Sequence, residues 1–257
     1  MHIDVQLLQG NTVLDLQLQA GKGNVLTTEV LHELVAHLRA HRDRPHLRMV
    51  LLRGSGGHFS FGAAVDEHRK DKAAAMLREF HSALRAVATC EVPVVALVEG
   101  KCLGGAFELA LVCHVVLAAP NASFACPEIK LGVLPPVLAA VGASRLGAAW
   151  TERLVLTGAE LPLAVAESTG FAVRLPADIP ALDAALGWYD NNLAGSSAHS
   201  LRVAVRAVRD GTGLTAALGE PLDRAERLYL DRLLPSHDGN EGIEAFLGRR
   251  PPQWRDA

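Results

Sequence analysis

Two glutamates and two glycine-rich turns are the residues of this chain whose types and spacing could do chemistry. Glu108 lies three residues after Gly105, at the start of the apolar stretch GKCLGGAFELALVCH, residues 100–114. If Gly104 and Gly105 lead into a helix, their amide N–H groups belong to the donors that a helix leaves unpaired at its N-terminus, where the dipole favours negative charge. Glu108 then lies one turn into the helix, on roughly the same face.

The first glycine-rich loop of the chain, residues 53–68, could offer a further amide, because its glycines leave the backbone around Ala63 sterically open. A third loop, residues 124–132, places Glu128 directly after Pro127, whose ring stiffens the chain. Two amide donors from different loops could form an oxyanion hole, and two carboxylates beside them suit proton transfer next to a carbonyl that must become an enolate.

Each feature also has a simpler structural explanation. Glu108 could only complement the positive end of a helix, Glu128 could be a solvated turn residue, and the glycines could serve close packing alone. If the two carboxylates do lie together, their repulsion should keep one of them protonated near neutral pH. The sequence does not indicate which one, and the pair should titrate as coupled groups.

Strand-like and helix-like segments alternate through the first two thirds of the chain and would position these loops. Apolar runs or apolar alternation predict strands at residues 12–19, 48–54, 93–100 and 115–119. Helical spacing predicts helices at residues 24–41, at residues 76–87 and from Gly105 onwards. This order predicts an α/β fold of stacked units.

The last quarter of the chain has a different pattern. No convincing strand follows Val173, and GSSAHS at residues 195–200 is the best boundary signal before two helix-like segments, residues 201–210 and 220–234. We therefore predict a core over residues 1–194 and a helical C-terminal region over residues 195–257.

Composition and charge favour small-molecule chemistry in a cytoplasmic protein. A chain of 257 residues that is 49% hydrophobic can bury a substantial core. The net charge of −3, without a dense run of lysine or arginine, argues against a nucleic-acid or membrane partner. The N-terminus does not resemble a signal peptide, and no apolar run reaches the roughly 20 residues of a membrane span.

The cysteines and histidines do not predict a metal site. The four cysteines, at positions 90, 102, 113 and 126, have no CxxC spacing and lie in or beside apolar runs. They are therefore interpreted as buried reduced thiols, with metal ligation as the alternative. The 11 histidines are scattered and none belongs to an HExxH pattern. We expect no metal and no separate cofactor.

Four collinear segments resemble the enoyl-CoA hydratase/isomerase, or crotonase, superfamily over almost the whole chain. HFSFGAAVDE resembles its first oxyanion-loop motif, CLGGAFELALVCHVVLA its second motif with the first glutamate, and ASFACPEIKLGVLPP its loop with the second glutamate. LVLTGAELPLAVAESTGFAVRL resembles the stretch beyond the site. The resemblance implies a crotonase-like spiral of ββα units with a helical C-terminal trimerisation region, assembled as a homotrimer or a dimer of trimers.

The resemblance also implies an acyl-CoA thioester as substrate, so that coenzyme A is part of the substrate and not a cofactor. The backbone amides of Ala63 and Gly105 would hold the thioester oxygen. Glu108 and Glu128 match the two glutamates that, in family hydratases, bind the attacking water and exchange protons with the α carbon of the substrate.

Further substrate contacts follow from the same resemblance. Val65 and Asp66 come after the first oxyanion loop, where the family's backbone meets the adenine and pantetheine of CoA. Lys22, Arg249 and Arg250 are candidates for phosphate contacts, although exposed basic residues are usually only solvated. The predicted substrate-binding residues are Phe61, Gly62, Val65, Asp66, Gly104, Val133, Pro135 and Pro136.

The chain departs from the family pattern at several positions. The family's common sequence Gly-Ala-Asp is replaced by Gly-Ala-Ala at residues 62–64. The change leaves the predicted oxyanion hole intact, because a backbone amide donor needs no particular side chain there. The usual PGAGG after Glu128 is PPVLA at residues 135–139, which predicts a stiffer and more apolar pocket wall. The family's third glycine is Ala106 and its frequent aspartate before the next strand is His114, changes that could affect packing alone.

The segments HFSFGA and LGVLPPV are more similar to the cyclohexa-1,5-diene-1-carbonyl-CoA hydratases of anaerobic benzoate breakdown than to fatty-acid enoyl-CoA hydratases. A flat cyclic acyl group would suit a pocket walled by Phe61, Val133, Leu134, Pro136 and Val137, side chains that could equally be ordinary core. We therefore predict a hydro-lyase that hydrates this cyclic thioester.

Other functions on the same scaffold remain open. These are a general enoyl-CoA hydratase of fatty-acid oxidation, an enoyl-CoA isomerase and an acyl-CoA hydrolase, because moving one carboxylate or water redirects the same enolate. A non-catalytic role, such as RNA binding, is a further alternative, against which the acidic balance and the intact site argue.

Overall fold

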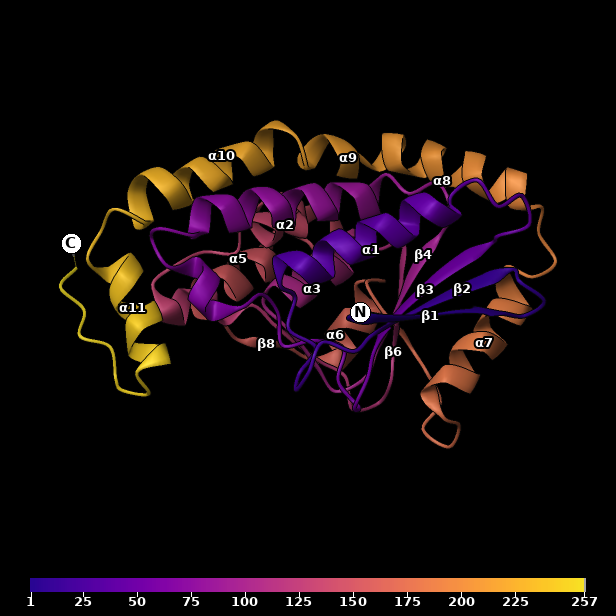
Figure 1. The fold of residues 1–257 in the computed structure, drawn as a ribbon, viewed down its shortest axis with the longest axis horizontal. Helices are drawn as coiled ribbons and strands as arrows, with labels where there is room; N and C mark the ends of the chain where they lie inside the picture. Colours follow the sequence, from indigo (N-terminus) through magenta and orange to yellow (C-terminus); the bar gives the residue numbers. More distant parts are fainter. Residues whose placement is uncertain (257) are drawn as a thin grey trace.

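The computed structural model describes residues 1–256 and contains a main sheet of six strands (Figure 1). Their spatial order is β1 (Ile3–Leu8), β2 (Val13–Leu18), β3 (Met49–Gly54), β4 (Val94–Val98), β6 (Val115–Ala118) and β9 (Val173–Arg174). β1 is antiparallel to β2, and the other neighbours are parallel. The predicted strands are confirmed within a few residues, while β1 adds an edge strand that the sequence pattern did not indicate.

A second, three-stranded sheet consists of β5 (Lys101–Leu103), β7 (Ser123–Ala125) and β8 (Glu160–Leu161). Its strands have two or three residues each, too few to show a period of two in the sequence. An isolated bridge between Ser60 and Cys102 attaches the first glycine-rich loop to this small sheet. The small sheet therefore brings the loops with the candidate chemistry together.

Helices cover both faces of the main sheet. The first seven are α1 (Thr28–His41), α2 (Ala73–Ala88), α3 (Gly105–Val112), α4 (Pro136–Leu146), α5 (Ala148–Thr157), α6 (Leu163–Ser168) and α7 (Ala181–Asn192). Figure 1 shows α7 on the opposite side of the sheet from α1 and α2. Because central strands such as β4 are buried on both faces, they appear in the sequence as continuous apolar runs.

The C-terminal region is helical, as predicted. It contains α8 (Ala198–Thr212), α9 (Leu214–Ala217), α10 (Glu220–Leu228), a π-helical turn (Tyr229–Leu233) and α11 (Asp238–Leu247). In Figure 1, α8, α9 and α10 form a row beside α2, and α11 lies at one end of the molecule. The boundary at residue 195 stays a prediction. Within residues 1–256, no helix is both long enough and apolar enough to cross a bilayer.

Two of the predicted helices, α2 and α3, lie next to the candidate site. Met76, Phe80, Leu84 and Val87 share a buried face of α2, as their spacing predicted. Helix α3 begins at Gly105, and all eight of its residues are buried. A helix that is apolar all round must lie inside the core, which explains why Glu108 is the only charged residue in α3.

Candidate active site

The first glycine-rich loop is held in place by backbone hydrogen bonds to neighbouring segments. The Leu26 N–H donates to the Gly62 carbonyl (2.9 Å), and the Leu103 N–H donates to the Ser60 carbonyl (3.1 Å). Gly62 has a φ of 95°, and a Cβ at this position would lie 2.5 Å from the Leu103 carbonyl oxygen. Only glycine fits this close approach, which fixes the direction of the next amide.

The backbone amides of Ala63 and Gly105 lie beside each other. A Cβ on Gly105 would lie 3.4 Å from the Ala63 nitrogen, and a Cβ on Gly62 would lie 3.2 Å from the Gly105 nitrogen. Among the residues that the structure describes, neither amide donates to a protein acceptor. Two adjacent unpaired N–H groups, one of them at the start of a helix, form a geometry suited to an oxyanion.

Glu108 lies in the first turn of α3 with only 3% of its surface exposed. Its Oε1 accepts hydrogen bonds from the Val137 N–H (2.7 Å) and the Leu138 N–H (2.9 Å). Both donors belong to the first turn of α4, where a helix has unpaired amides. Burial raises the pKa of Glu108, and the two amide hydrogen bonds oppose that rise because they favour the ionised carboxylate.

Glu128 lies in a short 3-10 helix, Pro127–Leu131, and is also buried. Its Oε1 lies next to Gly104, where a Cβ would come within 2.7 Å of that oxygen. Its Oε2 is buried and has no hydrogen-bond partner within residues 1–256. Burial raises the pKa of Glu128 first, and the neighbouring charge of Glu108 raises it further.

The unequal surroundings of the two carboxyl groups assign their protonation. Glu108 is stabilised as a carboxylate by two amides, whereas Glu128 has an unpaired oxygen and a negative neighbour. These surroundings favour the negative charge on Glu108 and the proton on Glu128. The sequence had left this assignment open.

A cavity of about 470 Å³ opens onto Glu128 and the two free amides. Six of the predicted site residues line it: Phe61, Ala63, Val65, Gly104, Gly105 and Glu128. The C-terminal region contributes another part of the wall, including Gly242 and Phe246 of α11. A Cβ on Gly242 would collide with the Leu131 carbonyl oxygen, so a glycine lets α11 approach the Glu128 segment closely.

The remaining predicted residues lie away from the lining of this cavity. Gly62 directly precedes the Ala63 amide in the chain, and Glu108 lies in the helix that begins at Gly105, but neither residue is part of the lining. Asp66 forms an ion pair with Lys72 (3.1 Å). Val133, Pro135 and Pro136 are buried, and Val133 belongs, with Val137, to the hydrophobic core.

The candidates for phosphate contacts differ in position. Arg250 lines the cavity, but its guanidinium already forms a bidentate pair with Glu241. Lys22 and Arg249 are not part of the lining. Arg250 could therefore reach a phosphate only by sharing or leaving its carboxylate partner.

Tyr229 is a polar residue near both glutamates that the sequence pattern did not indicate. The side chain is 1% exposed, and its hydroxyl has no hydrogen-bond partner among the described residues. Burial raises the pKa of Tyr229, and the charges of Glu128 and Glu108 raise it further. Tyr229 begins the π-helical turn after α10, a type of irregularity that is frequent at functional sites.

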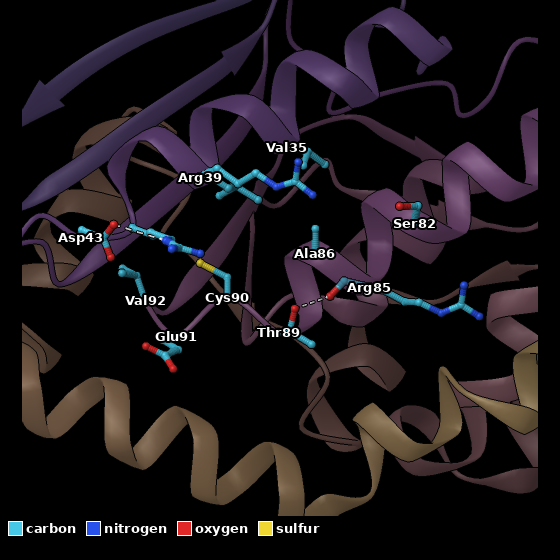
Figure 2. Close-up of a pocket in the computed structure, with 12 residues that line it drawn as sticks. Val35, Arg39, Asp43, Ser82, Arg85, Ala86, Thr89, Cys90, Glu91 and Val92 are labelled. Atoms are coloured by element: carbon cyan, nitrogen blue, oxygen red, sulfur yellow. Dashed lines mark hydrogen bonds and ion pairs between the residues drawn. The ribbon is translucent and has the colours of Figure 1, made fainter.

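A larger cavity, of about 630 Å³, lies between the ends of α1 and α2 (Figure 2). Two of its three arginines are paired, Arg42 with Asp43 (3.3 Å) and Arg85 with Asp223 (2.6 Å). Figure 2 shows the Cys90 thiol among its lining residues, and burial raises the pKa of that thiol, which makes it a poor nucleophile. The smaller cavity at Glu128 and the two free amides is therefore the better candidate for chemistry.

Comparison with known proteins gives consistent matches along the chain. A family model described as enoyl-CoA hydratase/isomerase matches residues 9–257. The chain is 38% identical over 254 residues to cyclohexa-1,5-dienecarbonyl-CoA hydratase of Thauera aromatica, covering 99% of this chain and 97% of that protein. It is 32% identical over 240 residues to 2,3-dehydroadipyl-CoA hydratase of Escherichia coli K12, covering 90% of each.

Solved structures agree with this result. The structure of an enoyl-CoA hydratase from Mycobacterium avium is similar with a TM-score of 0.82, at 31% identity and 98% coverage of both chains. An enoyl-CoA hydratase/isomerase from Xanthobacter autotrophicus Py2 has the same fold, with a TM-score of 0.85 at 24% identity, covering 96% of this chain and 93% of that one. The predicted family and the crotonase-like fold are confirmed.

Proposed function

Because the chain belongs to the enoyl-CoA hydratase/isomerase family, we propose that it adds water across a double bond conjugated to a CoA thioester. The observation that carries this proposal is the pairing of two buried carboxyl groups of unequal acidity with two free amide N–H groups. The thioester oxygen would accept hydrogen bonds from Ala63 and Gly105, which would stabilise the negative charge that develops on it.

The protonation of the pair gives each glutamate a role in this reaction. The Glu108 carboxylate accepts a proton as the water oxygen bonds to the β carbon, and the electrons of the double bond move onto the thioester oxygen. Protonated Glu128 then gives its proton to the α carbon, and the carbonyl re-forms. The product contains one added water, and a proton transfer from Glu108 to Glu128 restores the starting state.

Rough magnitudes show why all four groups are needed. One oxyanion donor typically contributes about 10²- to 10³-fold in rate, and one positioned acid or base about 10²- to 10⁴-fold. No single group accounts for the acceleration of a typical enzyme.

The proposed substrate is cyclohexa-1,5-diene-1-carbonyl-CoA, an intermediate of anaerobic benzoate degradation. The similarity to the Thauera aromatica hydratase over nearly the whole of both chains supports this choice. Because the chain also matches a 2,3-dehydroadipyl-CoA hydratase, a substrate with an open-chain acyl group is the competing possibility.

The proposed assembly is a homotrimer or a dimer of trimers. Helix α8 supports it, because Val203 and Val208 are 57% and 59% exposed on a helix with few buried residues of its own. An exposed apolar helix face of this kind is typical of a subunit interface. Light scattering after size exclusion tests the assembly, and a monomer would contradict it.

The test of function is to incubate the purified protein separately with cyclohexa-1,5-diene-1-carbonyl-CoA and crotonyl-CoA and to follow the products by mass. A rapid gain of one water on the cyclic thioester, with crotonyl-CoA slow, is the expected result. The reverse preference would indicate a fatty-acyl hydratase. A product of unchanged mass would indicate an isomerase, and release of free CoA a hydrolase.

A further inference from the structure

His68 is a polar side chain of the active-site cavity to which the proposed reaction assigns no role. It ends a short 3-10 helix, Val65–His68, just after the Ala63 amide, and it lines the same cavity as Glu128. Helix α11 packs against both this 3-10 helix and the one that carries Glu128. A thioester that places its reacting carbons at Glu128 therefore enters a space that His68 also lines.

One nitrogen of the His68 ring is held by the backbone. Nδ1 donates a hydrogen bond to the Ala64 carbonyl (3.2 Å), four residues earlier, since a carbonyl oxygen can only accept. Burial lowers the pKa of His68, although the Ala64 carbonyl and the charge of Asp66 oppose this effect. The ring is therefore neutral near pH 7 with its proton on Nδ1, and Nε2 carries a lone pair that can accept a hydrogen bond.

This acceptor is open to the cavity. The Nε2 atoms of His81 and His114 also lack a partner, but protein covers both of them, so a ligand cannot reach them. The His68 Nε2 has no hydrogen-bond partner within residues 1–256 either, but its ring is only half-buried and lines the cavity. Water can satisfy this nitrogen until a ligand displaces it.

The rest of the cavity makes this acceptor selective. Most of the lining side chains are apolar, among them Phe61, Val65, Leu103, Leu131 and Phe246. Lys130 and Arg250 also line the cavity, but their charged groups can only donate hydrogen bonds. A ligand that brings no donor to Nε2 leaves a desolvated acceptor unpaired, which weakens binding, whereas an O–H or N–H group restores the hydrogen bond.

We propose that His68 is a substrate-binding residue whose Nε2 accepts a hydrogen bond from an O–H or N–H donor of the bound thioester. The inference rests on the proposed hydration, because that reaction creates such a donor. The enoyl group has none, and hydration leaves a hydroxyl group next to the α carbon that Glu128 protonates. We expect this hydroxyl to be the donor. The CoA arm offers amide N–H groups in both thioesters, and the test separates the two sources.

The test is to titrate the full chain with cyclohexa-1,5-diene-1-carbonyl-CoA and with its hydration product by isothermal titration calorimetry. All the proteins carry Glu108→Gln, which slows conversion of the ligands without altering a residue of the cavity lining. His68→Phe removes both ring nitrogens. His68→Asn keeps a donor near the position of Nδ1, and His68→Gln places an acceptor near the position of Nε2.

His41→Asn is the matched control. The His41 Nδ1 donates to the His37 carbonyl (2.9 Å), also four residues earlier, at the end of α1. His41 does not line the cavity. This change alters the same kind of backbone contact away from the ligand, so both affinities should stay the same.

His68→Phe and His68→Asn should bind the hydrated thioester about 5- to 100-fold more weakly, because its hydroxyl loses its acceptor in the cavity. Both should bind the enoyl thioester as the parent does, and His68→Gln should restore most of the lost affinity. An equal loss for both thioesters, again restored by His68→Gln, would also support the proposal and would identify a CoA amide as the donor. If His68→Phe does not fold, the comparison of His68→Asn with His68→Gln decides the question.

Two results would overturn the proposal. One is an unchanged affinity of His68→Asn for both thioesters. The other is a loss that His68→Gln does not restore, which would give His68 only a structural role in its loop. The titrations require no turnover, so the proposed function is judged separately, by whether the wild-type chain hydrates the enoyl thioester.

Discussion

The two ends of α3 bury polar groups in opposite ways. At the N-terminal end, the free N–H of Gly105 lies near the carboxyl groups of Glu108 and Glu128. At the C-terminal end, the Val112 carbonyl accepts a hydrogen bond from the Arg209 guanidinium. Both arrangements place the charge that the helix dipole favours, yet both leave donors without acceptors. The difference lies in access, because Gly105 lines the cavity at Glu128, whereas the unpaired Nε atoms of Arg145 and Arg209 are fully buried.

The largest expected effects come from removing the carboxyl groups at the N-terminal end. Glu108→Gln and Glu128→Gln should each lower kcat by about 10²- to 10⁴-fold, because each removes a proton acceptor or donor. Circular dichroism and Tm should show a retained fold. Glu160→Gln, at an exposed position of β8, is the matched control and should keep wild-type activity. Near-normal rates for both site variants would refute the assignment.

The oxyanion geometry predicts the next largest effect. Gly62→Ala should lower kcat by about 10²- to 10³-fold, because the new Cβ meets the Leu103 carbonyl and displaces the Ala63 amide. Gly56→Ala is the control, since Gly56 also has a positive φ (66°) but a Cβ added there would have no atom within 4 Å. Steady-state kinetics of the two variants separates backbone strain from loss of the amide. Equal losses in both would exclude a specific role for the Ala63 amide.

The pH dependence should distinguish the two carboxyl groups. As the pH falls, kcat/KM should decrease when Glu108 becomes protonated, and as the pH rises, it should decrease when Glu128 loses its proton. Because burial raises both pKa values, both limbs should lie at higher pH than for an exposed glutamate. The residual activity of Glu128→Gln should lack the alkaline limb. An alkaline limb that persists in this variant would contradict the assignment of Glu128 as the acid.

The smallest expected effect concerns Tyr229. Tyr229→Phe should lower kcat by about 2- to 10-fold, the value of one neutral hydrogen bond to the reacting groups, without lowering the Tm. The control is Tyr189→Phe, because the Tyr189 hydroxyl donates to Thr12 Oγ1 (2.6 Å) far from the glutamates. This control should lower the Tm and leave kcat unchanged. A Tyr229→Phe enzyme with unchanged kcat and an unchanged pH profile would show that the hydroxyl takes no part in the reaction.

Much of the site could be predicted because its residues lie in contiguous segments. Gly105 and Glu108 are within four residues, so helix geometry alone places one free amide and a carboxyl group at one helix start. The Gly104 amide, predicted to be unpaired as well, instead donates to the Ala125 carbonyl (2.8 Å). The short strands β5 and β7 could not be predicted, because three residues do not establish a period. Their pairing, and not a local pattern, brings the first glycine-rich loop to α3.

The sequence by itself determined the residue types of the site, the helix that presents Gly105 and Glu108, and the family. Only the tertiary structure decided which glutamate is ionised, because the amides of Val137 and Leu138 reach Glu108 across 29 and 30 positions. Long-range packing also placed Arg209 beside a carbonyl 97 positions away. The physical reason is that a pKa or an unpaired donor depends on burial and on neighbours from distant segments, which local spacing does not specify.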